Sequence, residues 1–443
     1  MSRSPSPALN GRTDPLPNSD APAARLLALK QDYLIPCVNH FYRNPPVFVR
    51  GEMQYLVDTE GKRYLDCYSG VTVMNCGHCN PAITEPAIEQ IRTLQHTTSI
   101  YLTSPMLELA RDLIGFINGS LQRVFFVNSG SEANEGALLL ARLHTGRSGF
   151  IAIRGGLHGR THLTMSLTGV PMWQTDPVPS PAARLAPRPH CAQCELGKEP
   201  KTCKFACAVA LAEQIDPDTA AVILEPIQGN GGIIVPPDGY FHRLREITRE
   251  HGVLLIFDEI QTGFGRTGSD FAFQHLGVEP DILTLAKALG NGFPIGAFCT
   301  TERIAANYTK PGASTTGGNA VSATAARQVL RYLREHDLPR RAAELGGLLR
   351  QRFEAIAQSV CGVREVRGRG LMQAMELGSA THPMTAETDA ILEAMKDRGF
   401  LIGKTGLMRN TVTVMPPLVI TEAEVAALAD QLEQVMGALC GWA

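Results

Sequence analysis

The sequence lacks any long hydrophobic run and any excess of basic charge. No apolar stretch approaches the roughly 20 residues that a membrane-spanning helix needs, and 41 Lys and Arg face 43 Asp and Glu in 443 residues, a net charge of −2. We therefore expect neither a membrane protein nor nucleic acid as a partner. Residues 1–22 also lack the apolar block of a secretory signal. We expect them to form a disordered tail, and the protein to be cytoplasmic.

Disulfides are typical of secreted proteins, and the sequence shows no sign of secretion. The 11 cysteines are therefore expected to be reduced thiols. Four of them form the pattern C-x2-C-x8-C-x3-C within residues 187–207, which we call the cysteine insertion: Cys191, Cys194, Cys203 and Cys207. Such spacing can close a tetrahedral thiolate site, so one interpretation is a structural metal clip outside the catalytic centre. The other is an exposed loop whose cysteines bind nothing.

The order of apolar runs predicts the fold class. From Val124 onward short apolar runs, of the kind that form buried parallel strands, alternate with helical periodicity. These runs lie at residues 124–127, 150–153, 221–225, 253–257 and 281–285. The alternation predicts an α/β protein whose large domain holds a mostly parallel, doubly wound sheet.

Both ends of the chain predict a second, smaller α+β domain, as the length of the chain also suggests. Short antiparallel strands are expected between residues 46 and 66, and helices with two short strands between 320 and 439. We therefore place the N-terminal part of the small domain at 23–75, the large domain at 76–318 and the C-terminal part of the small domain at 319–443.

Two polar residues stand at the ends of predicted strands. Asp258 follows the apolar run 253–257, and Lys287 follows the run 281–286. Open α/β sheets bind ligands at the carboxyl ends of their strands, so we expect the acid and the amine in one crevice. A lysine in this place is a candidate nucleophile for a carbonyl. The alternative is a solvated loop lysine with a structural aspartate nearby.

A turn rich in small residues follows the strand at 124–127. Ser129, Gly130 and Ser131 stand where free N–H groups and the positive end of a helix dipole can hold a phosphate, although an ordinary helix cap uses the same residue types. A phosphate turn, an acid and an amine together are what pyridoxal 5'-phosphate (PLP) requires. The turn anchors its phosphate, the carboxylate faces its pyridine nitrogen, and the amine meets its aldehyde.

The motifs together resemble the class III, or omega, family of PLP-dependent aminotransferases of fold type I, and this resemblance implies a large-domain sheet of the seven-stranded type. The matching stretches are FVNSGSEANEGA (126–137), HGRT (158–161), ILEPIQG (223–229), LLIFDEIQTGFGRTG (254–268), ILTLAKALGNGFPIGA (282–297) and TTGGN (315–319). Within the family, LDCYSGVTVMNCGHCNP (65–81) and ILEPIQGNGG are similar to alanine:glyoxylate aminotransferases and to lyases that act on phosphorylated amino alcohols.

The resemblance implies roles for individual residues. Lys287 would form the Schiff base with PLP and act as acid and base, Asp258 would keep the pyridine nitrogen protonated, and Gln261 would reach the phenolic oxygen. The other implied cofactor contacts are Ser129, Gly130, Ser131, Leu157, His158 and Glu225, with packing as the role expected of His158. Thr315 resembles a threonine that reaches the phosphate in the neighbouring subunit. It implies a homodimer, or a dimer of dimers, with the active site at the subunit interface.

The chain departs from the family pattern at several positions. Leu157 stands where an aromatic residue usually covers the pyridine ring, and Asn230 replaces a glutamate found in many members. Thr413 falls where many members use an arginine for a substrate carboxylate, and a hydroxyl cannot replace a guanidinium. Arg409 is a candidate substitute, or else an ordinary loop arginine. Asn230 and Arg409 are thus the candidate substrate contacts.

The resemblance leaves two reactions open. One is transfer of the amino group of a primary amine or amino acid to a keto acid such as pyruvate or glyoxylate. The other is elimination of a β substituent from a phosphorylated or phosphono amino alcohol, which the loss of the carboxylate-binding arginine favours. A binding protein without chemistry is a third interpretation, which the intact Lys287 and Asp258 oppose.

Overall fold

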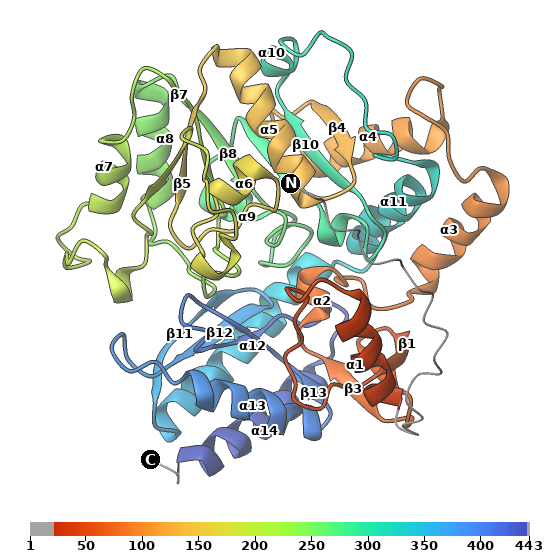
Figure 1. Ribbon diagram of the computed structural model, residues 1–443, viewed down its shortest axis with the longest axis vertical. Helices are drawn as coiled ribbons and strands as arrows, with labels where there is room; N and C mark the ends of the chain where they lie inside the picture. The colour runs from red at the N-terminus through yellow and green to blue at the C-terminus, as the bar shows by residue number, and fades with distance from the viewer. Residues whose placement is uncertain (1–21, 441–443) are drawn as a thin grey trace, which may run out of the picture.

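The computed structural model describes residues 22–440. Figure 1 draws a large sheet with its helices in the upper half of the molecule and two smaller sheets with their helices in the lower half. The disordered tail expected over residues 1–22 lies outside the described residues, except for Pro22. Pro22 begins helix α1 (Pro22–Tyr33), which the sequence analysis did not anticipate.

The large sheet has seven strands. Their order is β4 (Arg123–Val127), β10 (Gly296–Thr300), β9 (Ile282–Leu285), β8 (Leu254–Asp258), β7 (Thr219–Leu224), β5 (Gly149–Ile153) and β6 (Ala183–Ala186). Strand β10 runs antiparallel to both neighbours, and all other pairs are parallel. The predicted mostly parallel sheet is therefore confirmed.

Both faces of this sheet are covered by helices, and the strands present apolar side chains to both faces. Along β8, Leu255 and Phe257 belong to one hydrophobic cluster, while Leu254 and Ile256 belong to another on the opposite face. This alternation follows from the two-residue period of a strand. It explains why the runs read as continuously apolar.

Helices α4, α8 and α11 contribute to the first cluster, and α5, α6 and α10 contribute to the second. The helices of this half are α3 (Pro81–Thr93), α4 (Ser104–Ile117), α5 (Gly130–Thr145), α6 (His162–Ser166), α7 (Ala206–Ala212), α8 (Tyr240–Glu250), α9 (Ala272–Leu276), α10 (Glu302–Ala305) and α11 (Ala320–Glu335). Short 3-10 turns η1 (Pro171–Trp173), η2 (Cys191–Gln193) and η3 (Lys287–Leu289) complete it.

The smaller half contains two four-stranded sheets. One is β1 (Phe48–Glu52), β2 (Tyr55–Asp58), β3 (Arg63–Asp66) and β13 (Phe400–Leu401), and the other is β11 (Val363–Arg369), β12 (Met372–Leu377), β15 (Thr411–Val414) and β14 (Gly403–Thr405). Strand β13 pairs in parallel with β3. The two ends of the chain thus share a sheet, which confirms the small α+β domain built from both ends.

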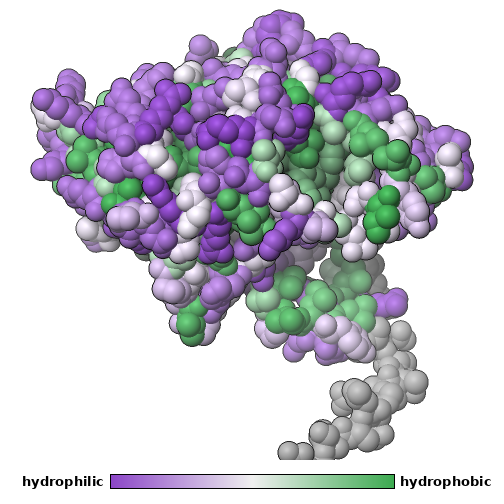
Figure 2. All heavy atoms as spheres, turned by 90° about the horizontal axis from the view of Figure 1, so that it is seen from above, coloured by the Kyte–Doolittle hydropathy of each residue, from purple (hydrophilic) through white to green (hydrophobic). Residues whose placement is uncertain are grey.

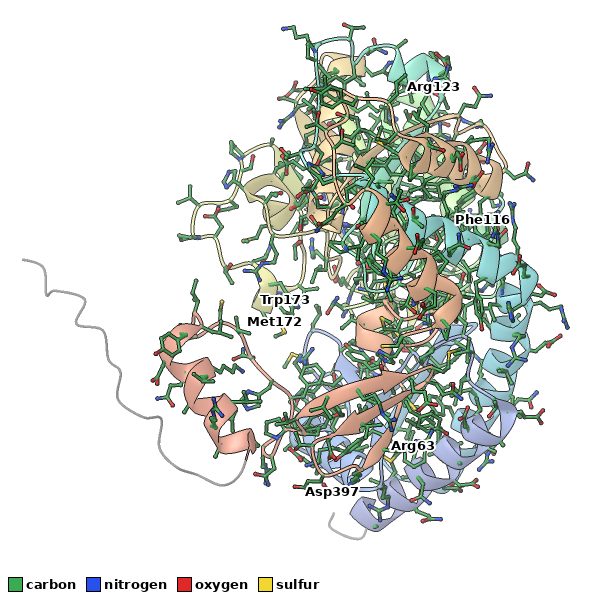
Figure 3. The ribbon with its side chains drawn as sticks, turned by 90° about the vertical axis from the view of Figure 1, so that its right-hand side faces the viewer. Arg63, Phe116, Arg123, Met172, Trp173 and Asp397 are labelled. Atoms are coloured by element: carbon green, nitrogen blue, oxygen red, sulfur yellow. The ribbon has the colours of Figure 1, made fainter. Side chains whose placement is uncertain are left out.

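The helices of the smaller half are α2 (Ser69–Thr72), α12 (Leu338–Ser359), α13 (Thr385–Asp397) and α14 (Glu422–Cys440). Helix α11 packs against α3 and α4, so it adjoins elements before the predicted boundary at 318/319. The numerical domain boundaries stay predictions. In Figure 3, α1 stands apart from the rest of the small domain, and the labelled Met172 and Trp173 lie at the edge of the large domain nearest to it.

None of the described helices is both long enough and apolar enough to cross a membrane.

Candidate active site

A cavity of about 360 Å³ opens at the carboxyl edge of the large sheet. Strands β4 and β9 both run antiparallel to β10, so their carboxyl ends meet at this edge beside those of β7 and β8. The predicted cofactor contacts that line the cavity are Ser129, Gly130, Ser131, Leu157, His158, Glu225, Asp258, Gln261 and Lys287. The volume lies within the range of small-molecule sites.

Asp258 ends strand β8 and is buried, so its carboxylate depends on protein donors. Its Oδ2 accepts hydrogen bonds from Nδ2 of Asn134 and from Nδ1 of His158, each at 2.8 Å, and its Oδ1 accepts from the Ile260 N–H at 3.1 Å. Asn134 is itself held by the Thr284 hydroxyl at 2.6 Å. These contacts fix the direction of the carboxylate.

Lys287 follows strand β9 and is half-buried in the cavity wall. Its φ of +46° is uncommon for a residue with a side chain, and backbone conformations of this kind gather at functional sites. Burial lowers the pKa of Lys287 to about 8, although Glu225 and Asp258 act in the opposite direction. The neutral amine, which is the nucleophilic form, is therefore accessible near neutral pH.

Glu225 follows strand β7 and is buried. Its carboxylate accepts hydrogen bonds from the N–H groups of Leu157 at 2.9 Å and of Gly229 at 2.8 Å. Burial, helped by the charge of Asp258, raises the pKa of Glu225. The amide of Gln261 lies so close to Gly229 that a Cβ there would stand 2.5–2.6 Å from it. Only glycine at position 229 therefore leaves room for the side chain of Gln261.

The phosphate turn enters helix α5 at the cavity. The Oγ of Ser129 accepts from the Glu132 N–H at 3.2 Å, and the Oγ of Ser131 accepts from the Arg160 N–H at 3.0 Å. Gly130 packs against Ile260, whose Cδ1 would lie 2.7 Å from an added Cβ. The N–H groups of the first turn have no acceptor within the helix. They can therefore serve an anion at the cavity.

Thr315 does not line the cavity of its own chain and is exposed. Its neighbours are tied to the cavity rim through Asn128. The Nδ2 of Asn128 donates to the Ser314 hydroxyl at 3.1 Å, and the Thr316 hydroxyl donates to Oδ1 of Asn128 at 2.7 Å. The loop that carries Thr315 is thus anchored beside the site.

The predicted substrate contacts also lie outside the cavity lining. The carbonyl of Asn230 accepts from the Gly406 N–H at 3.0 Å, and the guanidinium of Arg409 lies 5.4 Å from the ring centroid of Phe41. Thr413 is fully buried, and its hydroxyl lies 2.7 Å from that of Thr405. A buried hydroxyl bonded within the sheet does not offer a site for a carboxylate.

Two residues that the sequence analysis did not single out belong to the site. Arg160 is exposed and lines the cavity, and Asn134 orients Asp258 from helix α5. Arg160 follows His158 within the HGRT motif, so its place in the chain was a usable signal. Asn134 lies on the inner face of a helix, where an asparagine gives no comparable signal.

The four cysteines of the insertion line a separate small cavity of about 20 Å³, which also includes His190. All four are free, half-buried thiols. This cavity shares no lining residue with the one at the sheet edge.

The chain is similar to known proteins over nearly its whole length. Residues 38–436 match the family model described as aminotransferase class-III. The chain is 39% identical, over 95% of its length and 89% of the relative's, to alanine–glyoxylate aminotransferase 2 homolog 2, mitochondrial, of Arabidopsis thaliana. It is also 39% identical, over 90% of its length and 96% of the relative's, to an acetylornithine aminotransferase of Methanothermobacter thermautotrophicus.

Solved structures agree with these matches. An amine transaminase from an uncultivated Pseudomonas species, in its PLP-bound form, is 31% identical with a TM-score of 0.86, over 92% of this chain and 98% of that chain. A phospholyase from Arthrobacter in complex with phosphoethanolamine is 33% identical with a TM-score of 0.84, over 93% and 99% of the two chains. The fold is that of the fold type I PLP enzymes.

The cavity at the sheet edge fits PLP. It brings together an amine whose pKa burial lowers, a buried carboxylate with fixed direction, and the N-terminal turn of a long helix lined with serine and glycine. These groups match the aldehyde, the pyridine nitrogen and the phosphate of the cofactor.

Proposed function

Because the chain belongs to the class III aminotransferase family, and is a PLP-dependent aminotransferase, we propose that it transfers the amino group of a primary amine or amino acid to a keto acid such as pyruvate or glyoxylate. The observation that supports this is the shared cavity of Lys287, Asp258 and the first turn of α5. When bound, PLP supplies an electron sink that makes the Cα–H of the substrate acidic.

The residues of the cavity divide the work of binding and proton transfer. Asp258, held by Asn134 and His158, keeps a proton on the pyridine nitrogen. Lys287 would hold the aldehyde of the cofactor, and its amine, once free, would accept the proton from the substrate Cα. Its lowered pKa leaves it able to act as a base near neutral pH.

The remaining contacts hold the cofactor in place. Ser129, Gly130 and Ser131 would bind the phosphate at the start of α5, and Gln261 would reach the phenolic oxygen. Glu225 lines the same wall and holds the Leu157 and Gly229 N–H groups. Leu157 covers a ring face by apolar contact alone, so stacking contributes less here than with an aromatic residue.

A keto acid needs a cation for its carboxylate. Arg160 is exposed and lines the cavity, whereas Arg409 lies over Phe41 and outside the lining. We therefore favour Arg160 as the carboxylate partner, with Arg409 as the second candidate. Asn230 would act on the substrate only through a movement of its loop.

A homodimer completes the proposed site. The segment between α3 and α4 exposes Ile100, Tyr101 and Leu102, which are 81%, 66% and 89% accessible in the single chain. Figure 2 shows hydrophobic side chains on the right of the molecule, the side on which Figure 1 draws these helices. A second copy could cover this surface, and the family resemblance implies that Thr315 of each chain would then reach the phosphate of the other. A cytoplasmic location stays a prediction of the sequence.

A second candidate reaction is elimination of a β substituent from a phosphorylated or phosphono amino alcohol. Two observations favour it. Thr413 stands in place of the arginine that many members use for a carboxylate, and the Arthrobacter phospholyase is 33% identical to this chain. In this reaction the same deprotonation by Lys287 is followed by loss of the β substituent. The substituent, phosphate in the case of phosphoethanolamine, is released, and water hydrolyses the remaining enamine to an aldehyde and ammonia.

One experiment separates the two reactions. The PLP-loaded enzyme is incubated with a panel of amines, amino acids and phosphoethanolamine, with and without pyruvate or glyoxylate. Amino transfer predicts product only when a keto acid is present, with one keto acid consumed for each amine. Stoichiometric ammonia release without a keto acid would overturn the aminotransferase assignment for that substrate.

A further inference from the structure

The cysteine insertion places its four thiols around one small cavity. Cys191, Cys194, Cys203 and Cys207 are free and half-buried, and all line the same cavity of about 20 Å³. A cavity of about 10–15 Å³ is enough for a single water molecule. The space therefore has room for one atom-sized guest, with sulphur around it.

The insertion has no hydrophobic core that would explain why the thiols gather. From Cys191 to Cys207 no side chain is buried, and regular structure before helix α7 is limited to the η2 turn. Short segments that cannot bury a core are commonly stapled by disulfides or by a metal. Since these cysteines form no disulfide, their thiols remain available to a metal.

Backbone geometry at one thiol suits a bound thiolate. Gly197 has φ +61°, and its N–H donates to the Cys194 carbonyl at 3.0 Å, which closes a tight turn. The turn carries the Lys198 N–H back to Sγ of Cys194 at 3.4 Å. Hydrogen bonds from surrounding groups to the atoms that bind the metal are a regular feature of metal sites.

His190 supplies an independent observation. It is 5% exposed and lines the thiol cavity. Its Nε2 lies 2.9 Å from Oε2 of Glu365, but its buried Nδ1 has no hydrogen-bond partner within residues 22–440. A buried polar atom without a partner is costly. With the ring proton on Nε2, Nδ1 is an acceptor, and a guest in the cavity that His190 lines could give it a partner.

A rival metal site can be set aside. Ligand atoms of His190, Glu365 and Glu376 lie within 4.8 Å of one another. However, Nη1 of Arg367 donates to both carboxylates, at 2.7 Å each. Arg364, whose Nη1 lies 3.8 Å from Oε1 of Glu376, supplies a second positive charge, so the two guanidinium groups balance the two carboxylates and a metal cation would have to displace them. These residues form a linkage between segments instead of a metal centre.

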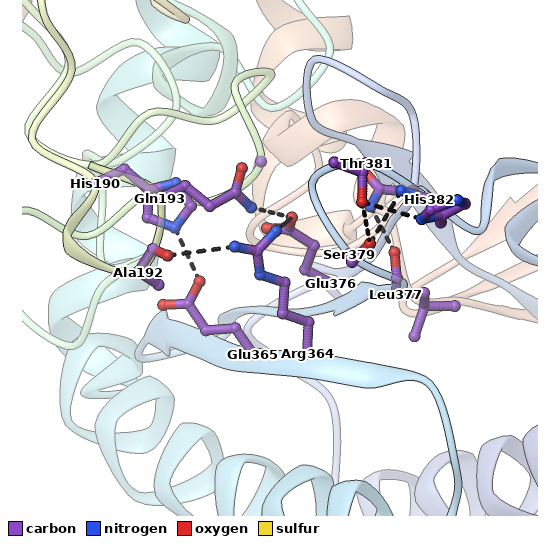
Figure 4. Close-up of polar contacts among 12 residues, drawn as sticks. His190, Ala192, Gln193, Arg364, Glu365, Glu376, Leu377, Ser379, Thr381 and His382 are labelled. Carbon is purple, nitrogen blue, oxygen red and sulfur yellow. Dashed lines mark hydrogen bonds and ion pairs between the residues drawn. The ribbon is translucent and has the colours of Figure 1, made fainter. Parts of the chain in front are cut away.

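Figure 4 shows this linkage between the cysteine insertion and strands β11 and β12. His190 bonds to Glu365, Gln193 bonds to Glu376, and the Ala192 carbonyl accepts from Arg364 at 3.3 Å. Arg367, in the same network, donates through Nε to the Gly232 carbonyl at 2.7 Å. The insertion is thus connected to the loop after β7, which leads back to the active-site residues Glu225 and Gly229.

We propose that Cys191, Cys194, Cys203 and Cys207 bind one zinc ion in a tetrahedral thiolate site. Four sulphur ligands and a closed coordination sphere are typical of structural zinc. No three of these sulphurs meet within 4.8 Å in the described chain, so binding turns the side chains towards the cavity. Each S–H bond is replaced by a Zn–S bond, each proton passes to solvent, and no electron is transferred. The clip holds the insertion against β11 and β12.

Elemental analysis tests the proposal on the intact, PLP-loaded enzyme. The protein is purified without added metal or affinity resins that carry metal, and dialysed against chelator-treated buffer. We expect one zinc ion per chain, measured by inductively coupled plasma mass spectrometry. Protein without metal, or with iron in place of zinc, would overturn the assignment. The readout does not depend on turnover, so it is independent of the proposed reaction.

Two further measurements locate the metal. Cys194→Ser and Cys203→Ser should lose the zinc, whereas Cys37→Ser, which alters an exposed thiol outside the insertion, should retain it. If the serine variants do not fold, exchange of the zinc for Co²⁺ in the unaltered protein decides. Thiolate ligands give intense sulphur-to-cobalt absorption, and a cobalt protein without it would contradict the site.

Discussion

The Nδ1 atom of His158 lies 2.8 Å from Oδ2 of Asp258, in a contact from which water is almost excluded. A carboxylate opposite the ring nitrogen places the proton on Nδ1. His158 therefore acts through Asp258, and its removal takes one of the donors that hold the carboxylate in place.

This relationship can be tested with His158→Phe, which keeps the ring volume but removes the donor. We expect a fall in the free energy of unfolding of about 1–3 kcal/mol, a lower kcat and a shifted absorption spectrum of bound PLP. His162→Phe is the matched control, because His162 is exposed and pairs with Asp176. An unchanged spectrum and kcat in His158→Phe would mean that Asn134 and the backbone suffice.

Lys287→Ala should abolish the reaction. The variant lacks both the amine that binds the aldehyde and the base that moves the Cα proton, and general acid–base catalysis alone contributes about 10²–10⁴-fold. The visible band of the lysine-bound cofactor should disappear as well. Lys310→Ala, at an exposed loop lysine, should keep both. Full activity in Lys287→Ala would refute the central assignment.

The pKa of about 8 at Lys287 predicts how PLP capture depends on pH. Below pH 8 the amine is mostly protonated, so the rate at which apoenzyme captures PLP should rise about tenfold per pH unit and level off above pH 8. Because Glu225 raises the pKa of Lys287, Glu225→Gln should move this profile to lower pH. Stopped-flow absorption measures it. A flat profile between pH 6 and 9 would be inconsistent with a titrating Lys287.

The two candidate arginines give opposite expectations. If Arg160 binds the keto acid, Arg160→Gln loses a charge-assisted hydrogen bond of about 1.5–3 kcal/mol, and the KM for the keto acid should rise about 10- to 100-fold. The KM for an amine donor without a carboxylate should barely change. Arg409→Gln, measured in parallel, should leave both constants near their original values. The reverse pattern would transfer the role to Arg409.

The role of Thr315 can be tested by mixing two inactive proteins. Thr315→Asp should repel the phosphate held by the other subunit, and Lys287→Ala disables its own site. In a mixed dimer one site carries both changes and the other carries neither. Each mixed dimer should therefore have about half the activity of the unaltered dimer. If mixing restores nothing although mixed dimers form, Thr315 does not act across the interface.

Most of the large domain could be predicted because its strands are buried on both faces, and their sequences are therefore unbroken apolar runs. Strands β6 and β10 were missed for a physical reason. Their sequences, Ala183–Ala186 and Gly296–Thr300, are short and rich in alanine or glycine, which have little strand preference. Helix α13 and strand β11 were also missed, since polar residues interrupt their apolar periodicity.

The candidate site was predictable where chemistry and topology coincide. Asp258 and Lys287 end strands of one sheet, so their sequence positions already place them at one edge. The contacts of Asn134 and Arg160 depend on how α5 and the loop after β5 fold over that edge, which no local pattern encodes. The family resemblance is confirmed. The roles given to single residues stay predictions that the variants above address.

The pairing of β13 with β3 has a consequence for synthesis of the chain. Strand β3 ends at Asp66 and its partner begins at Phe400, so the ribosome must add more than 300 residues before the sheet can be completed. At about 5–20 residues per second this takes on the order of 20–60 s. Meanwhile one edge of β3 remains unpaired. The nascent N-terminal strands are therefore a segment that chaperones would need to shield until translation is nearly finished.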